Sequence, residues 1–318
     1  MNILLTGGAG FIGANLAEAL LQDERVTHVR ILDNLATGHR HNIAGLLDDP
    51  RCSFVEGDIR DMETCRAACR GMDRVSHQAA LGSVPRSLKD PLTTHAVNIT
   101  GTLHIFQAAV EQGVPRVIFA ASSSTYGDHE ALPKVEDTIG KPLSPYAVTK
   151  YVNELYADVF AKAYDIDFIG LRYFNVFGPK QDPNGAYAAV IPLFFKAALH
   201  GEAPTINGDG SYSRDFTYVA NAVQANLRAL FTKDDAALNE VYNVACGHRT
   251  DLNTLWADIR RITGSTVEAQ HGPERAGDIP HSLASIDKAQ RLLGYHPTHT
   301  VAEGLAEAYA FYKEIFNP

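Results

Sequence analysis

The sequence predicts an α/β protein, with a doubly wound parallel sheet joined to a smaller C-terminal substrate-binding lobe. Short apolar runs that suit buried strands alternate with helical patterns over roughly the first 170 residues. Alternation of this kind favours a parallel sheet with right-handed crossovers. After Arg172 the composition changes, because Gly, Pro, Asn and Asp gather at residues 178–185 and 207–210. This change indicates a seam between the two parts.

The expected boundaries follow from that seam. Residues 1–173, with returning segments at about 212–245, should form the sheet domain, and residues 174–211 and 246–318 mainly the substrate lobe. The expected strands are, in chain order, residues 2–6, 28–32, 52–55, 75–77, 117–121, 167–171 and 241–244. Two helices matter most for function, one from near Asn98 to about Gln112 and one that starts at Pro145.

Composition and charge exclude several classes of protein. The net charge is −9 and the isoelectric point is near 5.8, which argues against nucleic acid or an anionic membrane surface as a partner. No apolar run approaches the ~20 residues of a membrane span, and the N-terminus lacks the basic start of a signal peptide. The four cysteines show no metal-ligand spacing and suit free thiols in a reducing compartment. We therefore expect a cytoplasmic protein without a metal site.

A glycine-rich turn follows the first expected strand and opens a helical pattern. Its glycines are Gly7, Gly10 and Gly13, spaced G-x-x-G-x-x-G. Gly7 permits a tight turn, Gly10 lets the backbone approach a pyrophosphate, and Gly13 lets the helix pack close to the sheet. The helix N-terminus then offers N–H groups and the positive end of its dipole to the phosphates. This context predicts a dinucleotide-binding turn.

Acidic residues after the second and third strands indicate which dinucleotide binds. Asp33 ends the second strand, about 20 residues beyond the turn, where a carboxylate suits the hydroxyls of the adenosine ribose. No arginine follows Asp33 immediately, so a 2′-phosphate would be repelled and NAD(H) is favoured over NADP(H). Asp58 could contact the adenine amino group, or it could cap a helix.

Small and hydroxylated side chains follow two later strands. Residues 78–86 leave room for a ligand, and the serines 122–124 should face the crevice at the carboxyl end of the fifth strand. Beyond the seam, Arg214 and Arg275 carry the guanidinium forks that a diphosphate needs.

Tyr146 and Lys150 are four residues apart in the run Ser-Pro-Tyr-Ala-Val-Thr-Lys. In a helix capped by Ser144, with Pro145 as its first residue, their side chains lie one turn apart on the same face. The ammonium would favour the tyrosinate and lower its pKa from the ~10 of a free phenol. Such spacing often arises by chance, but the glycine turn and the serines supply a nicotinamide and a hydroxyl for the pair. We expect Tyr146 to remove a proton from a sugar or alcohol hydroxyl, held by Ser122, while hydride leaves the same carbon.

Together these motifs resemble those of the extended short-chain dehydrogenase/reductase superfamily, which has a Rossmann sheet, and within it the UDP-hexose 4-epimerases. The resemblance spans nearly the whole chain. Its motifs are residues 6–13 (TGGAGFIG), 33–34 (DN), 57–61 (GDIRD), 122–124 (SSS), the Tyr146 and Lys150 pair, 172–175 (RYFN) and 214–216 (RDF). Three longer runs resemble the bacterial subgroup that prefers N-acetylated UDP-hexoses, namely residues 78–87 (QAALGSVPRS), 122–128 (SSSTYGD) and 181–192 (QDPNGAYAAVIP).

The resemblance implies a mechanism and a set of site residues. NAD stays bound, hydride leaves C4, a 4-keto sugar turns in the site, and hydride returns to its other face. The subunits of such enzymes pair through two helices each, including the Tyr146 helix, so a homodimer is expected. The expected catalytic residues are Tyr146, Lys150 and Ser122, although a short loop leaves open which of Ser122, Ser123 and Ser124 is the catalytic serine.

The residues expected at the cofactor are Gly7, Gly10, Phe11, Ile12, Asp33, Asn34, Thr37, Gly38, Asp58, Ile59, Gln78, Ala79, Ala80, Asn98, Tyr146, Lys150 and Tyr173. Those expected at the UDP-sugar are Gly82, Ser83, Ser122, Ser123, Ser124, Tyr146, Asn175, Ala189, Val190, Asn207, Arg214, Arg275, Asp278 and Ser282.

The substrate prediction rests on size. By resemblance, Ser282 stands where a bulky Tyr excludes N-acetyl groups, and Gly82 and Ala189 replace larger residues of galactose-type enzymes. The expected reaction is the reversible 4-epimerisation of UDP-N-acetylglucosamine (UDP-GlcNAc) and UDP-N-acetylgalactosamine. Space permits an acetamido group without demanding it. The uronic acid forms UDP-GlcNAcA and UDP-GalNAcA, or UDP-glucose and UDP-galactose, therefore stay open as substrates.

Other functions of the same fold stay as alternatives. A nucleotide-sugar 4,6-dehydratase needs an Asp-Glu pair at the end of the fifth strand, where this chain has Ser123 and Ser124. A decarboxylase of a uronic acid would need a cation at the carboxylate, for which Arg86 is the nearby candidate. A non-catalytic NAD-binding sensor would usually lose Tyr146 or Lys150, and both are present.

Overall fold

The computed structural model describes residues 1–183, 189–274 and 280–316. Its centre is a seven-stranded sheet in the order β11-β6-β5-β4-β1-β2-β3, and every neighbouring pair is parallel. The strands are β1 (Asn2–Thr6), β2 (His28–Asp33), β3 (Cys52–Glu56), β4 (Arg74–His77), β5 (Arg116–Ser122), β6 (Asp167–Tyr173) and β11 (Glu240–Val244). The predicted doubly wound parallel sheet is confirmed, with each strand within two residues of its expected bounds.

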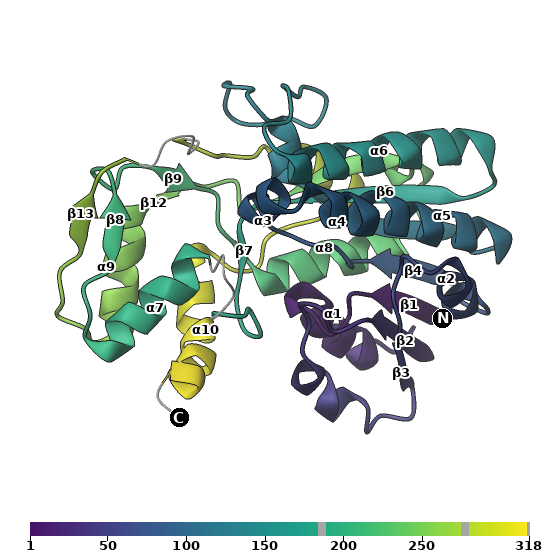
Figure 1. Ribbon diagram of the computed structural model, residues 1–318, viewed down its shortest axis with the longest axis horizontal. Helices are drawn as coiled ribbons and strands as arrows, with labels where there is room; N and C mark the ends of the chain where they lie inside the picture. Colours follow the sequence, from purple (N-terminus) through teal and green to yellow (C-terminus); the bar gives the residue numbers. More distant parts are fainter. Residues whose placement is uncertain (184–188, 275–279, 317–318) are drawn as a thin grey trace.

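Helices cover both faces of this sheet (Figure 1). One face carries α1 (Phe11–Gln22) and α8 (Val219–Phe231), which pack against each other. The other carries α2 (Met62–Cys69), α5 (Thr102–Glu111) and α6 (Pro145–Ala163). Alternate residues of β1 enter different cores, because Ile3 and Leu5 pack on the α1 side and Leu4 on the α5 side. Both faces of the sheet are therefore buried under helices, as is usual for a parallel sheet.

The order of the strands reverses at β1, the switch point of the sheet. Strands β2 and β3 extend the sheet from one edge of β1, and β4, β5 and β6 extend it from the other. The loops after β1 and β4 consequently diverge. A crevice at the carboxyl ends of diverging strands is where open α/β sheets bind ligands.

The helix expected from near Asn98 begins earlier than predicted. A continuous helical stretch starts with α4 (Pro91–His95), passes through a π-helical segment η3 (Ala96–Gly101) and continues as α5. The Asp90 carboxylate caps its start by accepting a hydrogen bond from Thr93 N. The sequence does indicate this earlier start, because a proline such as Pro91 is typical of the first turn of a helix. Asn98 thus lies in the π-helical turn.

The second part of the chain packs beside α8 and holds three long helices (Figure 1). These are α7 (Val190–His200), α9 (Leu252–Thr263) and α10 (Val301–Phe316). Three short strand pairs accompany them, namely β7 (Val176–Phe177) with β10 (Thr217–Tyr218), β8 (Thr205–Asn207) with β13 (Gln270–Gly272), and β9 (Ser213–Arg214) with β12 (Thr250–Asp251). The described part of the chain holds no helix long and apolar enough to cross a membrane.

Short helical turns complete the chain. They are α3 (Val84–Lys89), the 3₁₀ turns η1 (Arg40–Asn42), η2 (Ala44–Leu46), η4 (Ser123–Tyr126) and η5 (Asp235–Ala237), and the π-helical turn η6 (Ala289–Leu293). The turns that matter for the site are α3 and η4, because they follow β4 and β5 at the crevice.

Candidate active site

The glycine-rich turn between β1 and α1 has the conformation that its spacing predicts. Gly7 has a φ of +69°, and a Cβ there would lie 2.6 Å from Ala79 N. A Cβ on Gly13 would lie 2.1 Å from Gly7 O, so only glycine lets α1 approach the turn this closely. No side chain caps the start of α1 at Gly10. The amides of the first helical turn therefore face the crevice as a site for an anion.

Asp33 joins the end of β2 to this turn. Its side chain is nearly buried, and its two carboxylate oxygens accept hydrogen bonds from Ala9 N at 3.0 Å and Leu35 N at 2.8 Å. The carboxylate still lines the cavity described below. Its place at the strand end is the one that suits a ribose.

Asp58 does not cap a helix, which was one of its two predicted roles. Asp61 caps α2 instead, by accepting from Glu63 N and Thr64 N. Asp58 pairs with Arg60 at 2.6 Å and accepts a hydrogen bond from the Asn34 side-chain amide at 2.9 Å. The hydrogen bonds from Arg60 hold the pKa of Asp58 well below its usual range, so this acid stays ionised at the cavity wall.

The helix that carries Tyr146 and Lys150 starts as predicted. Ser144 Oγ accepts a hydrogen bond from Ala147 N at 3.1 Å, and Pro145 is the first helical residue. Lys150 is 4% exposed, and its ammonium donates to the carbonyl oxygen of Ala120 at 2.7 Å. Burial lowers the pKa of Lys150 to about 8, although the nearby Glu154 carboxylate acts in the opposite direction.

The pKa of Tyr146 differs from the sequence prediction. Burial raises it above the usual value for a phenol, and only a hydrogen bond with Ser122 acts to lower it. The expected lowering of this pKa by Lys150 was wrong, because desolvation of the phenolate is the largest effect and only the Ser122 hydrogen bond opposes it. Burial thus favours the neutral phenol of Tyr146.

The three serines after β5 have different roles. Ser122 Oγ accepts hydrogen bonds from Ser124 N at 3.2 Å and from Ser124 Oγ at 2.9 Å. These bonds leave the proton of Ser122 free to point at Tyr146, with which its hydroxyl interacts. Ser123 lines the cavity and Ser124 does not. The Ser124 hydroxyl, which we expected to face the sugar, is turned toward Ser122.

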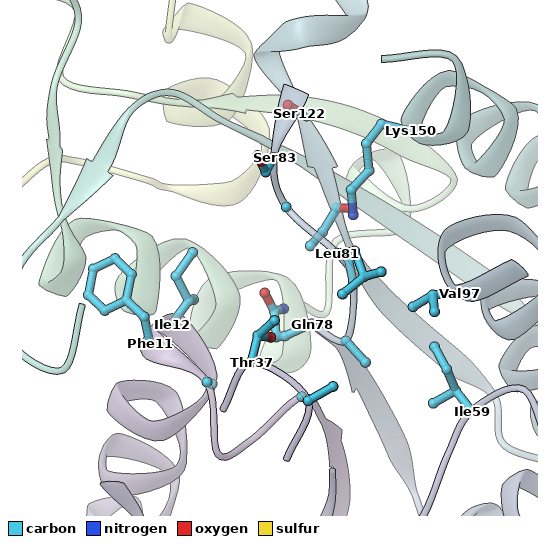
Figure 2. Close-up of a pocket in the computed structure, with 18 of the residues that line it drawn as sticks. Phe11, Ile12, Thr37, Ile59, Gln78, Leu81, Ser83, Val97, Ser122 and Lys150 are labelled. Atoms are coloured by element: carbon cyan, nitrogen blue, oxygen red, sulfur yellow. The ribbon is translucent and has the colours of Figure 1, made fainter. Parts of the chain in front are cut away.

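A cavity of about 650 Å³ brings these groups together at the carboxyl ends of β1, β2, β4 and β5. In Figure 2, Phe11 and Ile12 lie to one side of it, Lys150 and Ser122 to the other, and Gln78 between them. The predicted site residues that line it are Gly7, Gly10, Phe11, Ile12, Asp33, Asn34, Thr37, Asp58, Ile59, Gln78, Ala79, Ala80, Gly82, Ser83, Ser122, Ser123, Tyr146, Lys150, Tyr173 and Asn175.

A second cavity, of about 630 Å³, adjoins the first, since Asn175 and Val176 line both. Its predicted residues are Asn175, Ala189, Val190, Asn207 and Arg214. The sequence reasoning missed others that line this cavity, including Lys196, Tyr212, Phe216 and Leu252. Two cations, Arg214 and Lys196, therefore lie in its wall together with four aromatic rings.

Among the described residues, four of those predicted line neither cavity. Asn98 lies behind the wall, where its side-chain oxygen accepts from Leu81 N at 2.8 Å and its amide donates to Thr149 Oγ1 at 3.1 Å. Gly38 packs on the turn, since a Cβ there would lie 2.7 Å from Ala9 C. Ser124 is held by Ser122, and the backbone of Ser282 is held by the carbonyl of Ser213. These four support neighbouring backbone or side chains, a role that spacing in the sequence does not distinguish from direct contact.

Arg275 and Asp278, both expected at the UDP-sugar, lie outside the described residues. Other residues line the first cavity but were not predicted from the sequence. Leu81 belongs to the run of small residues after β4, whereas Thr93 and Val97 come from the helical stretch whose start was misplaced.

Comparison with protein families identifies this arrangement. Residues 3–245 match the model of the NAD dependent epimerase/dehydratase family. The chain belongs to this family. The predicted superfamily and the predicted cofactor, NAD, are thereby confirmed.

Individual relatives cover almost the whole chain. A putative UDP-glucose 4-epimerase from Methanocaldococcus jannaschii is 37% identical over 95% of both chains. The structure of the UDP-N-acetylglucosamine 4-epimerase from Methanobrevibacter ruminantium M1, in complex with UDP-N-acetylmuramic acid, is 38% identical, with a TM-score of 0.93 over 99% of this chain and 98% of that one. The UDP-glucose 4-epimerase of Thermotoga maritima, with UDP-glucose, is 35% identical, with a TM-score of 0.92 over 100% of both.

The cavity of this epimerase/dehydratase fits NAD. The space that Gly7 and Gly13 keep free, together with the uncapped start of α1, suits the pyrophosphate. Asp33 suits the adenosine ribose, and the cavity continues from there to Tyr146 and Lys150. We expect the nicotinamide end of the cofactor at Tyr146 and Lys150.

Proposed function

We propose that the protein catalyses the reversible, NAD-dependent 4-epimerisation of UDP-N-acetylglucosamine and UDP-N-acetylgalactosamine. The observation that carries this proposal is the junction of the two cavities. Tyr146, Ser122 and Lys150 line the cofactor cavity, which passes at Asn175 and Val176 into a second cavity with cations in its wall. A UDP-sugar that lies across this junction presents its hexose to the catalytic pair and its nucleotide to the lobe. The relatives named above act on UDP-sugars at the same carbon.

The chain's own residues supply binding and proton transfer. Tyr146 accepts the proton of the 4-hydroxyl, and Ser122, held by Ser124, donates a hydrogen bond to the reacting oxygen. The Lys150 ammonium, fixed on the Ala120 carbonyl, favours the tyrosinate once the site is filled. Bound NAD supplies the hydride acceptor and, after the sugar turns, the hydride donor. The 4-keto sugar turns while its nucleotide stays anchored.

The nucleotide is anchored by the smaller lobe in this proposal. We assign residues 1–173 and about 212–245 to the NAD-binding domain, and residues 174–211 and 246–318 mainly to the UDP-sugar lobe. Arg214 and Lys196 are described cations in the second cavity, and Tyr212 and Phe216 offer rings on which a uracil can stack. Arg275 and Asp278 stay assigned to the same ligand.

The choice of an N-acetylated sugar rests on open space. A Cβ added at Gly82 would meet nothing within 4 Å, and Gly82 lines the cofactor cavity. Ala189 is a small residue at the rim of the second cavity. Both leave room for an acetamido group, whereas Ser282 lines neither cavity. The same space also admits UDP-glucose, the sugar nucleotide of the Thermotoga maritima complex.

The test is a substrate panel for the purified protein. UDP-GlcNAc, UDP-glucose and UDP-GlcNAcA are incubated with it without added cofactor, and products and kcat/KM are measured for each. We expect conversion of UDP-GlcNAc to its galacto epimer with the highest kcat/KM. A higher kcat/KM for UDP-glucose or UDP-GlcNAcA would move the assignment to that sugar. A 4-keto-6-deoxy product would identify a dehydratase, and no turnover of any sugar would contradict the proposal.

We also propose that the protein is a homodimer that pairs through α6. Val148, Leu155 and Val159 lie along one side of this helix, and each is about half exposed, which is costly for apolar side chains in a monomer. Leu92 of the neighbouring α4 is 81% exposed. Together they form an apolar face of the kind that subunits bury against each other.

Leu155→Glu tests this dimer. It places a charge in the middle of the apolar face, so the mass in solution, measured by light scattering after size exclusion, should fall from two chains to one. Lys233→Glu, at an exposed position after α8 on the other side of the sheet, should leave the mass unchanged. A wild-type mass of one chain would contradict the proposal directly.

A further inference from the structure

Asn226 holds two side chains of the cofactor cavity from behind. It lies on α8, outside every motif recognised in the sequence, and its side chain is fully buried. It does not line the cavity, but Gln78 and Tyr173 do. The three side chains come from α8, from the end of β4 and from the end of β6. They form a closed ring of hydrogen bonds.

The direction of each bond in the ring can be assigned. Asn226 donates to the carbonyl oxygen of Ala222 at 2.8 Å, and a carbonyl can only accept, so the NH₂ group of Asn226 lies on that side. The same NH₂ group donates to the Tyr173 hydroxyl at 2.7 Å. Tyr173 in turn donates to Gln78 Oε1 at 3.0 Å, and Gln78 Nε2 donates back to Asn226 Oδ1 at 3.0 Å.

The ring uses every proton of the two cavity residues. The second proton of Gln78 Nε2 goes to Ser76 Oγ at 3.1 Å, away from the cavity. The single phenolic proton of Tyr173 goes to Gln78, and burial raises the pKa of Tyr173 to about 12, which keeps that proton in place. Gln78 and Tyr173 can therefore offer the cavity only the lone pairs of their oxygens.

We propose that Asn226 is a positioning residue for the nicotinamide end of NAD, because it fixes Gln78 and Tyr173 as hydrogen-bond acceptors toward the cofactor. Without Asn226, the Gln78 amide keeps only Ser76 and Tyr173 as partners, and rotation that presents its NH₂ group to the cavity costs less. The oxygens carry partial negative charge. A wall of such oxygens favours the positively charged, oxidised nicotinamide over the neutral, reduced one.

The proposal concerns the balance between the two forms of the cofactor and does not depend on which sugar is the substrate. In the proposed reaction the cofactor must be oxidised at the start and the end of each turnover. A wall that prefers the oxidised form therefore favours return of the hydride to the sugar. Asn226 is expected to act only through the two residues that it holds.

The test compares how the full-length protein binds the two forms of the nucleotide. The purified protein is equilibrated with mixtures of NAD⁺ and NADH, and the bound ratio is measured by extraction and by NADH fluorescence. Asn226→Leu should shift this ratio toward NADH by about tenfold, the equivalent of one ordinary hydrogen bond. In a Tyr173→Phe background the same substitution should shift the ratio less, because one of the two held acceptors is already gone.

Asn221→Leu is the matched control. Asn221 lies on the same helix, is equally buried and makes several hydrogen bonds, to residues 246, 298 and 299, but it does not line the cavity. It should cost stability and leave the bound ratio unchanged. If Asn226→Leu does not fold, Asn226→Ser replaces it. The serine side chain is polar but too short to bond to both Gln78 and Tyr173. The bound ratio should again shift toward NADH.

An unchanged ratio in the folded Asn226 variant would overturn the proposal. An equal shift in Asn221→Leu would overturn it as well, because the effect would then be a general consequence of a weakened helix. Failure of the protein to epimerise any UDP-sugar would contradict the proposed function and leave this measurement intact, since it reports nucleotide binding alone.

Discussion

Burial acts on the two ionisable groups at the centre of the site in a way that residue types alone do not show. It raises the pKa of Tyr146 and lowers that of Lys150 to about 8, since a low dielectric penalises the charged form of either group. Ser122 is the one described side chain that acts to lower the pKa of Tyr146. In the proposed reaction, proton transfer at Tyr146 therefore depends on the Ser122 hydroxyl and on the ligands that fill the cavity.

Lys150→Met should stabilise the fold and abolish activity. A lysine whose pKa falls from 10.5 to about 8 on folding destabilises the folded state by on the order of 3 kcal/mol. That cost is full below pH 8 and disappears as the pH rises toward 10.5, because the unfolded chain then loses the proton too. The variant should therefore melt above the wild type at pH 7, and the gap should narrow above pH 8.

Thermal unfolding across this pH range, with turnover assays, checks the prediction. Activity should fall by about 10²-fold or more, as expected for a proton-transfer group. Lys162→Met, an exposed position on the same helix, should change neither melting nor turnover. A Lys150→Met variant that melts below the wild type at pH 7 would show that the ammonium stabilises the apo fold.

Ser122→Ala and Ser124→Ala should separate the roles of the serines. Ser122 faces Tyr146, so its loss should lower kcat by about 10²-fold. Ser124 acts through Ser122, and its loss should cost no more than about tenfold, as for one neutral hydrogen bond. Steady-state kinetics of both variants measure the difference. A larger loss of kcat in Ser124→Ala than in Ser122→Ala would show that Ser124 is the serine that acts on Tyr146.

At the scale of elements, close backbone approach is what makes the turn between β1 and α1 a binding site. The end of β4, the turn and the first residues of α1 are packed so tightly that Gly7 and Gly13 have no space for a side chain. Asp33 of β2 ties this packing together through Ala9 N. The elements meet through backbone atoms, and their amides are therefore directed into the crevice rather than hidden behind side chains.

Gly13→Ala should damage both the fold and cofactor binding. Its Cβ would lie 2.1 Å from Gly7 O, a backbone atom that cannot give way, so we expect a loss of about 1–3 kcal/mol in unfolding free energy. The bound NAD of the purified protein should fall as well. Gly45→Ala is the control, since a Cβ there meets nothing within 4 Å. Chemical denaturation and nucleotide extraction of both variants test this. Equal unfolding free energies and equal amounts of bound NAD in the two variants would contradict this prediction.

At the scale of the whole molecule, the substrate must lie between two parts of the chain that are far apart in sequence. The cofactor cavity belongs to the sheet, and the second cavity belongs to residues between 175 and 252. Asn175 joins them, and its side-chain amide donates to the Asp215 carbonyl, next to Arg214. We therefore expect sugar selectivity to arise at the junction, which Gly82 lines from one side and Ala189 from the other.

Gly82→Leu should change the sugar preference without disturbing the fold, because the space at Gly82 is empty and its backbone needs no positive φ. The added side chain should take the room of an acetamido group. We expect kcat/KM for UDP-GlcNAc to fall by roughly tenfold or more relative to UDP-glucose. Competition between the two substrates measures this ratio. Equal losses of kcat/KM for both sugars would show that Gly82 does not determine the sugar preference.

The sequence by itself determined the features that depend on near neighbours in the chain. The strand, glycine turn and helix at residues 2–22, Asp33 at its strand end, and the capped helix that carries Tyr146 and Lys150 all follow from local pattern, and the structure has each of them. The NAD cofactor and the family follow from the same motifs. These properties are local because backbone conformation and side-chain spacing are set within a few residues.

Only the tertiary structure decided the features that depend on what packs against a residue. Asn98 and Ser124 look like ligand-binding residues in the sequence, but each hydrogen-bonds to its neighbours and lines neither cavity. Asn226 carries no signal in the sequence, yet it hydrogen-bonds to two residues of the cavity wall. The raised pKa of Tyr146 likewise follows from burial by segments far away in the chain. Burial and the direction of a hydrogen bond exist only once distant segments have met.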